Sequence, residues 1–278
     1  MRLLTFSGVL LDSGELQLEP GFVVEAEPPK TDGELTVEAL SRGRAIAATR
    51  LPLERPCGKP ASPPATEHPP RVAIGLVEFP ERATGLRVIH DGQTLLERTA
   101  PRPAGDPEVT WPDALEGDAV SLSWRSPQRE SLASLGYSND VGETWTPLSL
   151  PTAEETISFD ASMLPGGDRC LLELAVTDGF RTARLRSKDY EVEAKGWVLW
   201  ILSPGPGAAL SAAEPVLLAA QAYQLEERRP GFDEIVWRSS LDGGLGAGAQ
   251  LLAALRAGDH TVVAEGFGAS AEVRVSVA

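Results

Sequence analysis

The sequence predicts an all-β protein built from tandem β-sandwiches, three in number. Its 278 residues are too many for one sandwich of about 100 residues and suit three. Proline and glycine are frequent, at 23 and 27 residues, and the apolar residues gather in short alternating runs between turn signals. Long helices are therefore not expected, and each unit should bury a small core of its own.

The first unit is expected to span residues 1–100. In residues 34–39 apolar and polar side chains alternate, as a strand with one buried face requires. The Asp91-Gly92 pair lies between two apolar runs and predicts a hairpin turn. Residues 51–70 contain seven prolines, which exclude a paired central strand. They predict a surface excursion within the first unit, and a boundary between units is the alternative.

The second unit is expected to span residues 101–195. It opens with a Pro-rich joint at residues 101–107, whose stiffness predicts a fixed spacing between the first two units. Residues 120–124 then alternate as a half-buried strand does. One indole, that of Trp124 or Trp145, is expected in the core of this unit.

Residues 138–145 read Ser-Asn-Asp-Val-Gly-Glu-Thr-Trp and fit the Ser-x-Asp-x-Gly-x-Thr-Trp pattern called the Asp-box. The pattern predicts a β-hairpin rather than an active site, and it begins at Ser138. Asp140 is expected to accept hydrogen bonds from backbone N–H groups across the turn, and Gly142 to adopt a positive φ. Trp145 should return on the next strand and bury its indole.

The third unit is expected to span residues 196–278 and to repeat the plan of the second. The pattern Leu-x-x-Gly-Asp occurs at residues 164–168 and again at residues 255–259, a spacing close to one sandwich unit. Residues 247–257 have some helical spacing, but a strand followed by a turn is the interpretation favoured in a sandwich.

Several short motifs in the last two units occur together in known modules. They are Trp124, the Asp-box, the turn at 164–167 and the turn at 177–180, then Ser203-Pro204, Trp237-x-Ser239 and residues 255–260. On these residues the second unit resembles the fibronectin type III or immunoglobulin-like modules found in tandem in bacterial surface and secreted proteins. The third unit is similar to bacterial immunoglobulin-like or PKD-type repeats. The resemblance starts near Pro107 and implies the fold more than a function.

One departure from that resemblance concerns the turn before a central strand. In fibronectin-type modules a tyrosine usually follows the Leu-x-x-Gly turn, and its hydroxyl bonds back to the backbone. Here Cys170 and His260 occupy the comparable positions. This departure leaves open whether the corner hydrogen bond forms here.

The net charge of −15 disfavours binding to nucleic acid or to anionic membrane surfaces. An acidic, well-solvated surface explains the charge, and calcium at the junctions between units is the alternative. No run approaches the ~20 apolar residues of a membrane helix, so membrane insertion is not expected. Residues 3–11 are interpreted as a first strand rather than a signal peptide, so a leader would lie outside this chain.

No catalytic, cofactor or metal site is predicted. The Asp-box is abundant in propeller glycosidases such as sialidases, but those repeat it in every blade and this chain has one good copy. The three histidines share no ligand spacing, and no nucleophile motif is present. Cys57 and Cys170 are expected to be free thiols, with Cys170 buried.

The chain has six tryptophans, which is more than the single core indole expected in each of the three units. Trp111, Trp197 and Trp200 lie near the predicted starts of units. They are expected to pack between neighbouring units, and binding of a ligand such as a glycan is the alternative.

Together these features predict a non-catalytic spacer, adhesion or accessory-binding region of a larger extracellular or cell-surface protein. One alternative is a carbohydrate-binding or peptidase-linked accessory module of a secreted hydrolase. Another is a structural subunit of a surface assembly, whose exposed edge strands pair with neighbours. The partner, a protein or a glycan, is not identified by the sequence.

Overall fold

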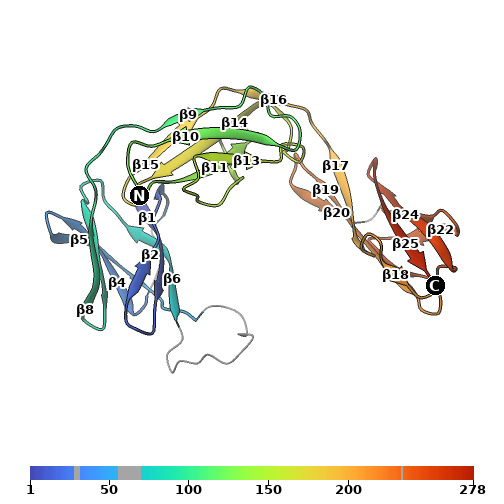
Figure 1. The fold of residues 1–278 in the computed structure, drawn as a ribbon, viewed down its shortest axis with the longest axis horizontal. Coiled ribbons are helices and arrows are strands. Elements are labelled where there is room, and N and C mark those ends of the chain that lie inside the picture. The colour runs from blue at the N-terminus through green and yellow to red at the C-terminus, as the bar shows by residue number, and fades with distance from the viewer. Residues whose placement is uncertain (28–31, 56–69, 233) are drawn as a thin grey trace.

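A computed structural model of the protein describes residues 1–27, 32–55, 70–232 and 234–278. Within those residues the chain forms twenty-five strands and no helix. The strands form three lobes along an arch, with the N-terminus in the first lobe and the C-terminus in the third (Figure 1). The prediction of an all-β protein of tandem β-sandwiches is confirmed, and each lobe has its own buried core.

The first lobe packs one four-stranded sheet on another. In the first sheet, β1 pairs with each of the other three strands: β1 (Arg2–Leu10), β2 (Leu16–Leu18), β3 (Val23–Glu25) and β6 (Arg71–Glu78). The second sheet has the order β5-β4-β7-β8: β4 (Leu35–Ser41), β5 (Arg44–Leu51), β7 (Gly85–His90) and β8 (Gln93–Thr99). The alternation predicted for residues 34–39 is confirmed, because Leu35, Val37 and Ala39 are all buried.

Two turn predictions in the first lobe have different outcomes. Asp91 and Gly92 both have positive φ between β7 and β8, which confirms the predicted hairpin. The Pro-rich excursion was expected to start at Leu51, but Leu51 is fully buried and pairs with Leu35 as the last residue of β5. Its apolar side chain completes the core, so the excursion starts later. Residues 56–69 of the excursion lie outside the described residues.

The second lobe combines a three-stranded and a five-stranded sheet. The first sheet has the order β13-β10-β9: β9 (Glu108–Thr110), β10 (Val120–Arg125) and β13 (Thr156–Phe159). The second has the order β12-β11-β14-β15, with β16 also on β14: β11 (Leu132–Ser138), β12 (Thr146–Pro147), β14 (Gly167–Thr177), β15 (Thr182–Arg186) and β16 (Tyr190–Val192). Cys170 on β14 is fully buried and its thiol is free, as expected. Burial raises the pKa of that thiol.

The third lobe also pairs a four-stranded with a five-stranded sheet. In the first, β17 and β20 flank β19, and β23 also pairs with β19: β17 (Trp197–Ser203), β19 (Val216–Gln224), β20 (Arg229–Gly231) and β23 (Gln250–Ala253). The second has the order β18-β25-β24-β21-β22: β18 (Ala209–Leu210), β21 (Val236–Ser239), β22 (Gly243–Ala247), β24 (Gly258–Gly266) and β25 (Ala269–Val277). β23 confirms a strand, not a helix, within residues 247–257. These strand orders match immunoglobulin-like sandwiches.

The two Leu-x-x-Gly-Asp turns lead into β14 and β24, and both keep a corner hydrogen bond. The Tyr137 hydroxyl, on neighbouring strand β11, donates to the Pro165 carbonyl. His260 donates from Nε2 to the Arg256 carbonyl at 2.7 Å, because a carbonyl can only accept. The corner hydrogen bond, which the sequence left open, therefore forms in both lobes. A tyrosine one strand away and an imidazole in place of the phenol reach the same turn carbonyls.

We expect His260→Leu to destabilise the third lobe by about 1–3 kcal/mol, because His260 is only 2% exposed and its loss removes the hydrogen-bonding partner of two groups. These are the Arg256 carbonyl and the Ser239 hydroxyl, which lies 2.7 Å from Nδ1. Denaturant unfolding measures the change. Asp259→Ala, at the exposed neighbouring position, is the control and should leave stability nearly unchanged. Equal losses in the two variants would contradict the role of the imidazole.

Candidate functional site

The Asp-box turn joins β11 to β12 through a closed set of hydrogen bonds. The Asp140 carboxylate accepts from the Ser138 hydroxyl at 2.6 Å, the Thr144 backbone N–H at 2.9 Å and the Thr144 hydroxyl at 2.5 Å. The Ser138 hydroxyl oxygen also accepts from the Gly142 N–H at 2.8 Å, and Gly142 has a φ of 86°. The hydrogen bonds from Ser138 and then Thr144 hold the Asp140 pKa far below its usual range. These polar side chains of the motif are thus hydrogen-bonded within its own turn.

The Asp-box indole lies on the outer face of the second lobe, not between its sheets. Trp145 is half-buried and crosses strand β11 where Gly136 leaves room, since a Cβ there would lie 3.5 Å from the ring. The Arg186 guanidinium lies over the indole, 5.2 Å from the ring centroid. Arg186 Nε also donates to the buried Glu173 carboxylate at 3.0 Å. Trp124, by contrast, is the indole in the core.

The junction between the second and third lobes is organised by one carboxylate. Glu226, just after β19, accepts from the Gly166 N–H at 3.0 Å and the Lys195 N–H at 2.9 Å through Oε1. Its Oε2 accepts from the Gly196 N–H at 3.0 Å. Burial alone would raise the Glu226 pKa, but these backbone donors outweigh it and lower the pKa. Sequence reasoning missed Glu226, because it reads as one residue of a polar turn.

The Asp-box loop also contacts the third lobe. Arg228 of the loop between β19 and β20 donates to the Asn139 side chain at 3.2 Å. The Lys195 ammonium, in the connection between the lobes, donates to the Leu164 carbonyl at 2.9 Å. The Asp-box hairpin and the corner turn of β14 therefore form the end of the second lobe that faces the third.

At the junction between the first and second lobes, one aromatic side chain of the second lobe, that of Phe180, is inserted as a plug into the first lobe. Phe180, in the turn between β14 and β15, is 7% exposed and belongs to the core of the first lobe. Its ring centroid lies 6.1 Å from that of Phe79. The preceding Asp178 holds the turn by accepting from the backbone N–H groups of Phe180 and Arg181. The apolar residue after an Asp-Gly turn was the sequence signal that could have indicated this plug.

Hydrogen bonds between the two lobes surround the plug. The Thr177 hydroxyl donates to the Gly21 carbonyl at 2.6 Å. The Val23 N–H donates to the Thr182 hydroxyl oxygen at 2.8 Å. The Arg181 guanidinium donates to the Pro101 carbonyl, so the Pro-rich joint is fastened to the second lobe.

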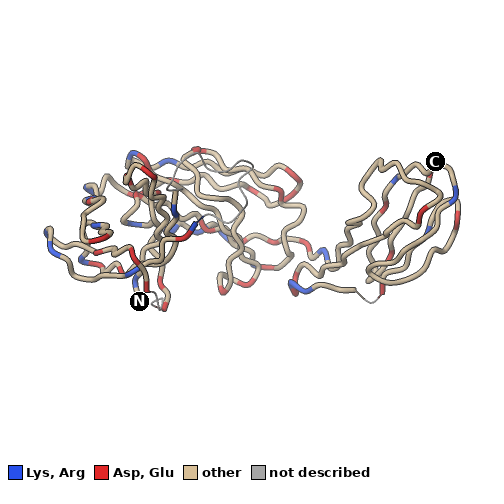
Figure 2. The backbone as a smooth tube through the Cα atoms, turned by 90° about the horizontal axis from the view of Figure 1, so that it is seen from below, with Lys and Arg blue, Asp and Glu red and all other residues tan. Residues whose placement is uncertain are grey.

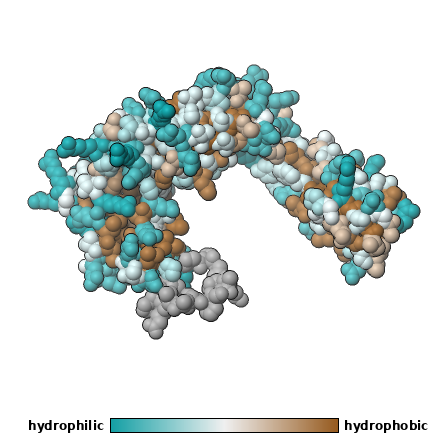
Figure 3. Space-filling model, viewed as in Figure 1, coloured by the Kyte–Doolittle hydropathy of each residue, from teal (hydrophilic) through white to brown (hydrophobic). Residues whose placement is uncertain are grey.

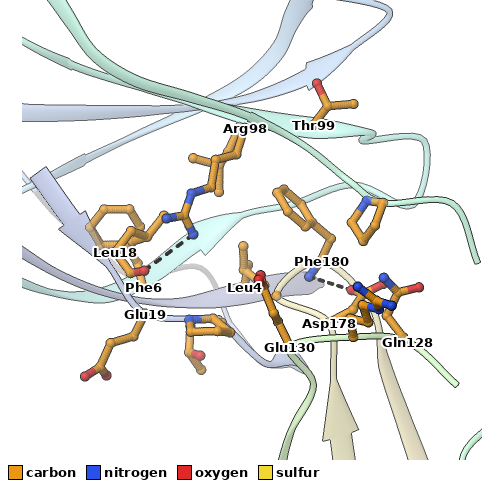
Figure 4. A pocket seen from close by; sticks show the side chains of 17 residues that line it. Leu4, Phe6, Leu18, Glu19, Arg98, Thr99, Gln128, Glu130, Asp178 and Phe180 are labelled. Atoms are coloured by element: carbon orange, nitrogen blue, oxygen red, sulfur yellow. Dashed lines mark hydrogen bonds between the residues drawn. The ribbon is translucent and has the colours of Figure 1, made fainter. Parts of the chain in front are cut away.

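A cleft of about 480 Å³ opens beside Phe180, with walls from both lobes (Figure 4). Leu4, Phe6 and Leu18 form its apolar side, and Arg98 donates to the Leu18 carbonyl at 3.4 Å. Glu130 lies on the opposite wall. The described lining contains no histidine, cysteine, serine or lysine, and its titratable side chains are Glu19, Arg98, Arg129, Glu130 and Asp178.

A serine, a histidine and an aspartate do lie together in the third lobe. The Ser239 hydroxyl is 2.7 Å from His260 Nδ1, and Asp242 Oδ2 is 3.7 Å from the same nitrogen. Both imidazole nitrogens are occupied, and His260 and Ser239 are buried. A substrate has no access to this group, so its role is to hold the turn and the strand together.

The structure gives three different surroundings to the tryptophans that were expected to pack between neighbouring units. Trp111 is half-buried against the core of the second lobe. Trp197 packs against the core of the third lobe and stacks on Phe267, with ring centroids 4.3 Å apart. Trp200 is 40% exposed and lies 6.5 Å from the Tyr223 ring. Trp200 is therefore the member of this set that presents its ring to solvent.

Within the described part of the chain, no three His, Cys, Asp or Glu side chains are grouped so as to hold a metal ion. The same residues contain no helix of the length and apolarity needed to cross a membrane. Cys57 lies outside the described residues.

Comparisons with known proteins give distant likenesses only. No family model matches the chain, and no curated protein matches it. Among solved structures, it is similar to the fibronectin(III)-like modules of Clostridium thermocellum CbhA, with 15% identity, a TM-score of 0.24, and coverage of 62% of this chain and 94% of that one. It is also similar to the four N-terminal Ig domains of Dscam1 isoform 6.9, with 12% identity, a TM-score of 0.23, and coverage of 98% of this chain and 65% of that one. A third similar structure is Escherichia coli alpha-2-macroglobulin activated by porcine elastase, with 9% identity, a TM-score of 0.23, and coverage of 100% of this chain and 31% of that one.

We expect Gly142→Val to destabilise the second lobe by about 1–2 kcal/mol, because a β-branched residue resists the left-handed region. The added Cβ would also lie 3.2 Å from the Trp145 ring. Calorimetric unfolding measures the effect. Gly244→Val is the control, since Gly244 lacks a positive φ and has open space around it. A Gly142→Val protein that unfolds like the wild type would contradict the Asp-box geometry.

We expect Glu226→Gln to loosen the second junction, because an amide offers one acceptor oxygen where the carboxylate offers two. Small-angle scattering should show a broader distribution of interatomic distances. Glu227→Gln is the matched control, because Glu227 is exposed and pairs with Arg229. Since the folded pKa is lowered, the carboxylate contributes stability above about pH 4.3, its ordinary pKa. That contribution is lost as the pH falls through the lower folded value. Unchanged scattering from Glu226→Gln would refute the role of this carboxylate.

Proposed function

We propose that this chain is a non-catalytic spacer that holds neighbouring parts of a larger extracellular bacterial protein at a set geometry. The observation that carries the proposal is that each junction contains a side chain from one lobe seated in the next. Phe180 enters the first lobe, and Glu226 of the third lobe binds backbone N–H groups of the second. Domains joined by a linker alone move relative to one another by default, and these seats oppose that motion.

The magnitude of the first seat supports a stiff junction. Burying a phenylalanine side chain contributes about 1.5–3 kcal/mol relative to leaving it exposed. The hydrogen bonds of Thr177 and Thr182 to the first lobe add to it. A bend at this junction would have to expose the Phe180 ring and break both hydrogen bonds.

The chemistry of the remaining groups supports a role without catalysis. The described lining of the cleft beside Phe180 has no histidine, cysteine, serine or lysine, and the Ser239–His260 pair is buried. Asp and Glu residues occur along the backbone of all three lobes (Figure 2), which suits a soluble surface. The extracellular, bacterial part of the proposal rests on the resemblance of the second and third units to tandem modules.

A carbohydrate-binding accessory role is the second candidate. One observation favours it, namely that the exposed ring of Trp200 lies beside Tyr223 on an outer sheet face. Aromatic faces are suited to stacking on apolar faces of ligands.

We expect Phe180→Ala to destabilise the first lobe by about 3–5 kcal/mol and to broaden the distribution of interatomic distances in small-angle scattering. The variant removes the ring that both fills the first core and joins it to the second lobe. Phe232→Ala, at a half-exposed position of the third lobe, is the control. Wild-type scattering that already requires freely moving lobes would refute the spacer proposal.

A further inference from the structure

One sheet of the third lobe carries no charge on three of its strands. β17, β19 and β23 contain no Asp, Glu, Lys or Arg, although 23% of the chain is charged. Their outer side exposes four large apolar side chains: Trp200, Leu202, Leu217 and Leu252. In the view of Figure 3, hydrophobic residues reach the surface on each of the lobes, the third lobe among them. Such a face marks an interaction surface in a soluble protein.

β17 is an edge strand of this sheet. It pairs with β19 and, among the described residues, with no other strand, whereas β19 has partners on both sides. Soluble proteins usually protect such an edge with lysines, prolines, β-bulges or very short strands. β17 has seven residues and no lysine or proline, and its one irregularity lies at its C-terminal end. Its register is irregular between Ile201 and Ser203, so residues 197–201 form the regular part.

The regular part of β17 has an apolar side chain at every position on both sides of Leu199. Val198 and Trp200 flank it on the outer side, because Leu199 itself lies in the core. Trp197 and Ile201 follow on the inner side, where both pack against the same core. A strand with this order can pair antiparallel with a copy of itself about a two-fold axis, as an isologous interface requires.

We propose that β17 pairs antiparallel with β17 of a second copy of this chain. Pairing centred on Leu199 places Val198 of each copy opposite Trp200 of the other. Aromatic and β-branched residues are favourable partners across antiparallel strands. The two charge-free faces become continuous, and the unpaired backbone groups of both edges find partners.

The net charge of the chain and the direction of its strands are consistent with a second copy as the partner. Each copy has a net charge of −15, so association away from an uncharged face is opposed by repulsion. β17 leads from the second lobe into the third at one end of the arch (Figure 1). Antiparallel pairing therefore sends the remaining lobes of the two copies in opposite directions and keeps their acidic surfaces apart. This inference does not depend on the spacer role.

Sedimentation velocity of the full chain, from nanomolar to high micromolar concentration, tests the proposal. We expect a concentration-dependent dimer that is lost in Val198→Lys and in Trp200→Lys, because a lysine on the edge opposes strand pairing. Leu252→Lys lies on the same face but two strands away, and Leu150→Lys lies on the second lobe. Both controls should still dimerise. Unchanged melting temperatures verify that the variants fold.

Hydrogen exchange supplies a second measurement that needs no variant. The amides of residues 197–201 that point away from β19 should gain protection as the wild-type concentration rises. A monomer at every concentration overturns the proposal, as does a dimer that survives Val198→Lys and Trp200→Lys. A monomeric wild type that binds an insoluble polysaccharide through Trp200 also overturns it, and assigns the face to a glycan.

Discussion

Both junctions of the molecule are made at the two ends of one strand, β14. The corner turn before its first residue gives the Gly166 N–H to Glu226 of the third lobe. The turn after its last residue inserts Phe180 into the first lobe. At roughly 3.3 Å per residue, its eleven residues separate the junctions by about 36 Å. The strand is buried from Cys170 to Thr177, so the distance between the junctions is set by the most protected element of the second lobe.

The corner turns show that a backbone carbonyl, rather than a particular side chain, imposes the constraint. A buried carbonyl without a donor is costly, and a tyrosine at one fixed position is one way to supply the donor. This chain supplies it once from the neighbouring strand, through Tyr137, and once from His260. The imidazole also contacts Ser239, so it joins the turn to a second strand as a phenol would not.

Local features of the fold could be predicted from the sequence, and contacts between lobes could not. The alternation of residues 34–39 and the turn at Asp91-Gly92 depend on neighbours along the chain, and both were predicted. Phe180 follows an Asp-Gly turn, and its role was not predicted. The reason is that its ring packs among residues between Leu4 and Val88, far away in the sequence. Glu226 lies in a polar run that is typical of any exposed turn. Its importance comes from three N–H groups that only the folded connection assembles.

The position of Phe180 also affects the order in which the chain can fold during synthesis. Domains usually fold one by one as they leave the ribosome, beginning with the first. Here the first lobe holds all its own strands by residue 99, yet a ring of its core arrives with residue 180. The first lobe therefore leaves the ribosome with an open site in its core. It becomes complete only when the central strand of the second lobe has formed, so the two lobes mature together.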